Sequence, residues 1–112
     1  MSGQVMSEPL AESSNSIWDV EEEDIYESHW KISKSSFSNG GIIEFSGNAS
    51  FGSNHNVASD MFPKGPWTYV CRNHVNINFG DSHSIDIIFV NQFLFIGLID
   101  REPIFIGCRL SN

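Results

Sequence analysis

The sequence predicts an all-β, mainly antiparallel fold: a meander of about seven or eight short strands, closed as a small barrel or stacked as a sandwich. Three observations predict it. At His74–Phe79, apolar residues alternate strictly with polar ones, the period of a strand with one buried face. Similar segments recur as far as residue 108, separated by Gly, Asn and Asp at hairpin spacing. The polar residues are mostly Ser and Asn, a mixture that suits strands and turns better than helices.

The acidic charge is confined to the beginning of the chain. The net charge is −8, and eight acids but no Lys or Arg precede Ser28, whereas six acids balance six bases after it. A chain of this charge is a poor match for nucleic acid, which requires a basic surface. We see no signal-peptide h-region and no apolar run near the ~20 residues of a membrane span. We therefore expect an intracellular protein, cytoplasmic or nuclear, that binds no nucleic acid or membrane.

The acidic leader divides into two parts. Residues 1–15 lack periodicity and are predicted to be a disordered tail. Residues 16–29 are predicted to be an amphipathic segment, because Ser16 to Asp19 fits a capping box and apolar residues follow at helical spacing. One short helix that covers an open face of the body is the favoured interpretation. The alternative is an acidic peptide that orders only on a partner.

Residues 30–112 form the predicted β domain. The turn signals Asn39-Gly40-Gly41 and Gly47-Asn48 separate its first short strands, and residues 52–66 are predicted to be a long loop. The expected strands begin at Trp30, Ile42, Ala49, Trp67, His74, Ile85, Phe93 and Ile104.

Loop length fixes the expected pairing of the central hairpin. A three-residue loop at 80–82 places Ile77 opposite Ile85 and Val75 opposite Ile87. A two-residue loop would oppose these apolar residues to polar ones, because a slip of one residue turns every side chain to the other face. We therefore predict the longer loop.

The run Phe93–Ile99 has no polar side. One of its faces is expected to line the core, and the other needs the leader helix, a second sheet or another subunit as cover. Its centre, LFIGL, nearly repeats ten residues later as IFIGC. A two-residue loop at Arg101-Glu102 would set Gly97 opposite Ile106 and Gly107 opposite Ile96, where glycine lets strands bend or approach closely.

No motif predicts a catalytic, metal or cofactor site. The four histidines lack metal-ligand spacing, and Cys71 and Cys108 are isolated thiols that we expect to be buried and reduced. The spacing leaves open whether these two cysteines pair. A weaker alternative is a small enzyme with a His/Asp site at His74, His83 and Asp86.

Spaced Trp and Gly residues suggest one further alternative. Trp30, the segment Gly41–Phe45, Trp67 and the hairpins ending at Arg109 resemble the small calycin-type barrels over residues 30–110. The leading Gly-x-Trp signature is missing, because Ser28-His29 precedes Trp30. The resemblance implies an apolar interior that holds a small ligand. Nine phenylalanines indicate instead that side chains fill the barrel.

The main functional prediction is a non-enzymatic protein interaction module: a subunit, adaptor or inhibitor of a larger assembly, with self-association possible. Exposed aromatic anchors are typical of such surfaces. The expected contacts are the acidic leader and the outer face of the apolar strand. Their candidate residues are Ile17, Trp18, Ile25, Tyr26, Phe93 and Phe95.

Overall fold

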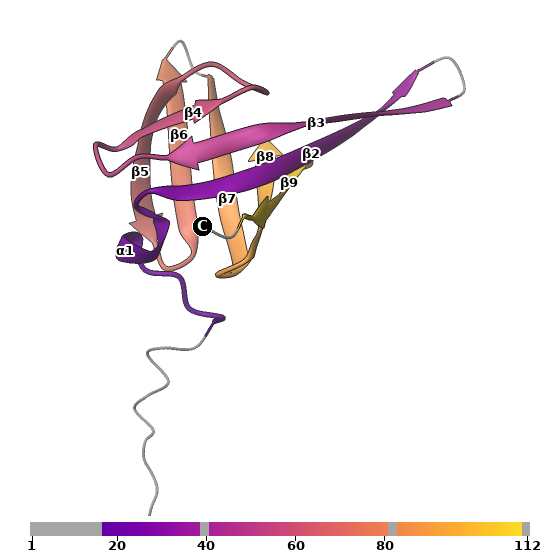
Figure 1. The fold of residues 1–112 in the computed structure, drawn as a ribbon. Coiled ribbons are helices and arrows are strands. Elements are labelled where there is room, and N and C mark those ends of the chain that lie inside the picture. The colour runs from indigo at the N-terminus through magenta and orange to yellow at the C-terminus, as the bar shows by residue number, and fades with distance from the viewer. Residues whose placement is uncertain (1–16, 39–40, 81–82, 111–112) are drawn as a thin grey trace, which may run out of the picture.

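A computed structural model describes residues 17–38, 41–80 and 83–110. Eight antiparallel strands pair in sequence order and close into one barrel (Figure 1), which confirms the predicted all-β meander and selects the barrel. The predicted disordered tail and the turn residues Asn39 and Gly40 lie outside the described residues. The elements are α1 Glu22–Ile25, β2 Ser28–Ser38, β3 Gly41–Phe51, β4 Asn56–Ser59, β5 Gly65–Cys71, β6 His74–Gly80, β7 His83–Asn91, β8 Leu94–Ile99 and β9 Glu102–Arg109.

The central hairpin has the predicted register. Ile77 pairs with Ile85 and Val75 with Ile87, and all four side chains are buried. Strict alternation therefore specified both the strands and their pairing.

Aromatic side chains fill the barrel toward one end. The ring of Trp30 lies 4.9 Å from Phe95 and 5.4 Å from Phe89, and Phe51 lies 5.9 Å from Trp67 (centroid distances). All five rings are buried. This packing agrees with the interior expected from the high phenylalanine content.

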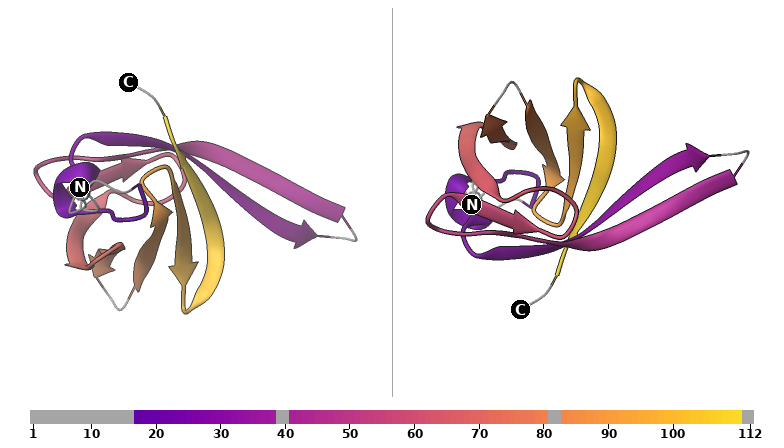
Figure 2. Two further views of the ribbon diagram at one scale, coloured as in Figure 1. Left: turned by 90° about the horizontal axis from the view of Figure 1, so that it is seen from below. Right: turned by 90° about the horizontal axis from the view of Figure 1, so that it is seen from above.

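The strands near the first hairpin differ from the expected ones. The segments that begin at Ile42 and Ala49 form one strand, β3, and the predicted loop 52–66 contains β4 and the start of β5. The strand β4 forms because Val57 is buried and pairs with Phe51. β9 pairs with β2 only over Trp30–Lys34, so the outer half of the β2–β3 ribbon projects beyond the barrel (Figures 1 and 2).

A bulge changes the predicted register of the last hairpin. The pairing shifts between Gly97 and Leu98, so that Gly97 faces Phe105 and Phe95 faces Gly107. The predicted pairs of Gly97 with Ile106 and of Gly107 with Ile96 are therefore wrong by one residue. The physical result is that each glycine makes room for a phenylalanine ring inside the barrel.

The leader is less helical than expected. Its helix has only four residues, because Glu27 takes a positive φ of 57° and turns the chain into β2. The segment crosses one end of the barrel, which we call the capped end (Figures 1 and 2). Val20 and Ile25 are fully buried there. The leader thus covers one barrel end, and its helix spans only four residues of the predicted segment.

A chain of contacts at the capped end joins the leader to the first and last strands. The indole Nε1 of Trp30 donates to Ser28 Oγ (2.8 Å), and that buried hydroxyl donates to the carbonyl oxygen of Ile25 (2.6 Å). The Arg109 guanidinium lies 5.7 Å from the Trp30 ring centroid and donates to the carbonyl oxygen of Asp24 (3.0 Å). These contacts satisfy polar groups that closure of the barrel removes from water.

Both cysteines are free and exposed, so the expectation of buried thiols is wrong. Cys71 ends β5, and Cys108 occupies an outward position of β9 between buried Gly107 and half-buried Arg109.

Gly107→Ala should lower the free energy of unfolding by about 1–3 kcal/mol, the usual effect of overpacking a core. A methyl group at this position would overlap ring carbons Cε2 and Cζ of Phe95. Gly97→Ala should cost less, because its nearest neighbour, Phe105 Cβ, would lie 3.2 Å away. Urea unfolding of both variants measures the difference, and wild-type stability of Gly107→Ala would contradict the close approach.

Ser28→Ala should lower the free energy of unfolding by about 1–3 kcal/mol, because it leaves the buried indole N–H of Trp30 without its acceptor. Ser33→Ala is the control: this residue is on the same strand but exposed, and its loss should change stability by less than about 0.5 kcal/mol. Equal unfolding curves for the two variants would argue against a structural role for the Ser28 hydroxyl.

Candidate interaction face

The outside of β7, β8 and β9 carries a continuous row of isoleucines. Ile88 pairs with Ile96, and Ile96 pairs with Ile106, so the three residues lie side by side across three strands. Burial alternates along these strands: Phe89, Phe95 and Phe105 point inward. The isoleucines take the outward positions between them, and Ile106 remains 54% exposed.

The neighbouring outward positions extend this apolar surface. Leu94 pairs with Cys108, Val90 is exposed, and Leu98 is half-buried. We call the whole surface the β7–β9 face; its residues are Ile88, Val90, Leu94, Ile96, Leu98, Ile106 and Cys108. None of them carries a charge.

Polar residues border the β7–β9 face on both sides. On one side β2 presents Lys31 opposite Cys108 and Ser33 opposite Ile106. On the other side β6 presents His74 opposite Ile88. Asp86, on β7 at the edge of the face, has its Oδ1 3.0 Å from His74 Nε2 and accepts a hydrogen bond from Asn76 Nδ2 (3.0 Å). An apolar patch with a polar rim is typical of a protein-binding surface.

The structure divides the six predicted contact residues. Ile25 and Phe95 are buried in the core, and Tyr26 is half-buried with its ring 5.8 Å from Trp67. These three side chains hold the barrel together. Ile17, Trp18 and Phe93 are 42%, 60% and 53% exposed.

Ile17 is hydrogen-bonded to the turn that carries Phe93. The amide of Gln92, next to Phe93, donates to the carbonyl oxygen of Ile17 (2.7 Å). Phe93 also accepts a hydrogen bond from the amide of Arg109, which precedes exposed Leu110. Apolar surface is therefore exposed at the capped end as well as on the β7–β9 face.

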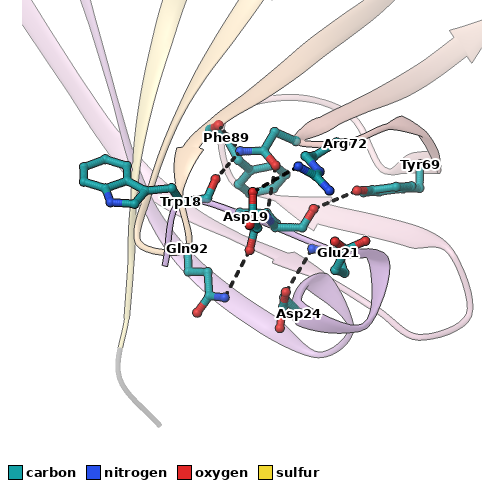
Figure 3. Close-up of polar contacts among 10 residues, drawn as sticks. Trp18, Asp19, Glu21, Asp24, Tyr69, Arg72, Phe89 and Gln92 are labelled. Atoms are coloured by element: carbon teal, nitrogen blue, oxygen red, sulfur yellow. Dashed lines mark hydrogen bonds and ion pairs between the residues drawn. The ribbon is translucent and has the colours of Figure 1, made fainter. Parts of the chain in front are cut away.

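Asn73 fixes the leader to the barrel. Its Oδ1 accepts from the amide of Val20 (3.0 Å), while its Nδ2 donates to the carbonyl oxygens of Trp18 (2.9 Å) and Phe89 (3.0 Å). Its φ of 63° is a conformation that Asn tolerates better than most residues. The Trp18 indole points away from these polar contacts (Figure 3).

Two further side chains hold the backbone on either side of Val20. The hydroxyl of Tyr69 donates to the carbonyl oxygen of Val20 (2.7 Å), and Gln92 Nε2 donates to that of Asp19 (3.2 Å) (Figure 3). An ion pair of 3.4 Å joins Arg72 to the Asp19 carboxylate. Part of the acidic charge is thus neutralised where the leader crosses the barrel end.

The His/Asp alternative is only partly assembled. His74 and Asp86 are in contact, and the hydrogen bond from His74, followed by that from Asn76, holds the pKa of Asp86 below its usual value. His83 pairs with Gly80 at the other end of β7 and does not join them. Within residues 17–38, 41–80 and 83–110, no group of three or more His, Cys, Asp and Glu side chains could hold a metal ion.

Sequence reasoning missed Ile88, Ile106 and Asn73. No local sequence motif distinguishes Ile88 or Ile106, and only the pairing of three strands places them in one row. Asn73 could not be found from local patterns, because its contacts with the leader span more than 50 residues.

Comparisons with protein families, with curated proteins and with solved structures found no match to this chain. No helix in the described part of the chain has the length and apolar content to cross a membrane.

His74→Ala should raise the pKa of Asp86 toward that of an ordinary aspartate, about 3.9, because it removes the hydrogen bond that lowers it most. In the wild type the folded pKa is below the unfolded value, so this contact stabilises the fold above the unfolded pKa and is lost as the pH falls through the folded pKa. An NMR titration of the Asp86 carboxyl carbon measures the shift, with His29→Ala as control. An unchanged pKa in His74→Ala would contradict the assigned cause.

Proposed function

We propose that this protein is a non-enzymatic interaction module that binds a protein partner, or a second copy of itself, through the β7–β9 face. The observation that carries the proposal is the row Ile88–Ile96–Ile106, which places three β-branched side chains side by side on the outside of a closed barrel. Among the described residues, the interior already buries fifteen apolar side chains without them. Selection for stability of this barrel alone does not account for an uncharged row on its surface.

The energetics favour association at this face. Burial of apolar surface contributes roughly 25 cal/mol per Å², and the centre of a stable interface is apolar and depleted of charge. The charged neighbours Lys31 and Asp86 lie on its two borders, where charges guide orientation and approach more than they add affinity.

The exposed side chains Ile17, Trp18 and Phe93 form the second part of the proposed contact. They are carried by backbone that is hydrogen-bonded to the barrel, so little conformational entropy is lost when they bind. Ile25, Tyr26 and Phe95 instead shape the domain that presents them. Free thiols at Cys71 and Cys108 support a reducing, intracellular compartment.

Ile106→Glu tests the proposal, because it puts a charge at the most exposed position of the isoleucine row. We expect it to weaken partner binding or self-association by at least roughly tenfold, since an unpaired charge would be buried in the interface. Thr68→Glu is the matched control: it adds the same charge at an exposed position of β5, half-way round the barrel in strand order. Circular dichroism should show wild-type stability for both variants.

Two measurements read the result. Analytical ultracentrifugation reports self-association, and quantitative affinity capture with wild-type, Ile106→Glu and Thr68→Glu baits reports a heterologous partner. The proposal predicts a species that the wild type and the control both retain and that Ile106→Glu loses. If Ile106→Glu keeps every interaction of the control, the β7–β9 face is not the binding surface.

A further inference from the structure

The end of the barrel opposite α1 contains a cleft of about 360 Å³. Its walls come from five strands and from the loop between β4 and β5, so it is a feature of the closed barrel and not of one hairpin. Its volume lies in the range of small-molecule sites. It shares no residue with the β7–β9 face, so ligand binding at the cleft does not require the proposed function.

The apolar part of the cleft is aromatic. Phe62, from the loop between β4 and β5, lies 5.9 Å from Phe79 and 5.8 Å from Phe105 (centroid distances). Phe105 and Ile85 are 4% and 3% exposed and connect this group to the core. Such a floor favours an aliphatic or aromatic ligand body.

The polar part is a rim with Lys34, His83, Ser84 and Asp100. The Lys34 ammonium lies 6.0 Å from the ring centroid of Phe45, and among the described residues it takes part in no ion pair. Phe45 lies outside the lining, whereas Lys34 belongs to it, so the Lys34 ammonium at the rim offers charge complementarity to an anionic head group. Among the described lining residues Asp100 is the one carboxylate, and it opposes this attraction.

Charged residues of both signs flank the lining. Asp60 precedes the lining residue Met61, and Glu102 lies two residues after the lining residue Asp100. Lys64 follows the lining residue Pro63, and Arg101 follows the lining residue Asp100. The acids of the described leader lie at the capped end, at the other end of the barrel. The overall charge of −8 therefore does not describe the field at the cleft.

We propose that the cleft binds a small amphiphilic carboxylate, with its apolar chain against Phe62, Phe79 and Phe105 and its carboxylate at Lys34. His83 and Ser84 supply further hydrogen-bonding groups at the rim. The aromatic packing around Trp30 keeps the ligand at the mouth, because the interior beyond is filled with side chains.

The test is to titrate the full chain with decanoate and to monitor its amide chemical shifts by two-dimensional NMR. Decanol and decyltrimethylammonium are titrated in the same way as the neutral and cationic analogues. We expect saturable shifts around Phe62, Phe79 and Ser84, and tighter binding of decanoate than of either analogue. Lys34→Gln should weaken decanoate roughly tenfold, whereas Lys64→Gln, outside the lining, should stay within about twofold. Asp100→Asn should bind decanoate at least as tightly as the wild type.

Three results would overturn the proposal: equal or tighter binding of the cationic analogue, an affinity for decanoate unchanged by Lys34→Gln, or shifts confined to the β7–β9 face. The first would remove the charge argument and the second the role of Lys34. The third would mean that decanoate reports only the outer apolar surface. Ile106→Glu should leave the titration at the cleft unchanged, which separates this site from the proposed protein-binding function.

Discussion

Closure of this barrel depends on the contacts that the buried indole of Trp30 makes with its neighbours. The indole lies where the first strand meets the last, with Ser28 as its hydrogen-bond acceptor and the Arg109 guanidinium over its ring. Through the carbonyl oxygens of Asp24 and Ile25, the same group ties the leader to both strands. Without this junction β2 and β9 would be free edges.

Closure also explains how the molecule separates three surfaces. The leader supplies its acids and its buried Val20 and Ile25 to the capped end, and Arg72 neutralises part of that charge. The opposite end keeps an aromatic cleft beneath Lys34. The cleft does not include any residue of the β7–β9 face, so the proposed ligand and the proposed protein partner would not compete for one surface.

The sequence predicted what local patterns encode. Strict alternation at His74–Phe79 fixed one hairpin, including its register, because only one pairing buries every apolar residue. The last hairpin escaped prediction, since a bulge at Leu98 depends on how Phe95 and Phe105 share the interior with glycines. The predicted two-sided apolar strand directed attention to β8, but the face it belongs to needed residues of two further strands. The leader contacts remain a prediction for Ile17 and Trp18.

If the leader is an integral part of the closed barrel, its amides should be protected like those of the strands, and native-state hydrogen exchange measures this protection. The amides of Val20 and Glu27 and the indole N–H of Trp30 donate to Asn73, Phe51 and Ser28, respectively. We expect these three protons to exchange as slowly as the amides of β6 and β7, because all of them are exposed only by global unfolding. Fast exchange at Val20 and Glu27, with slow exchange in the strands, would show a leader that detaches from a barrel able to stand without it.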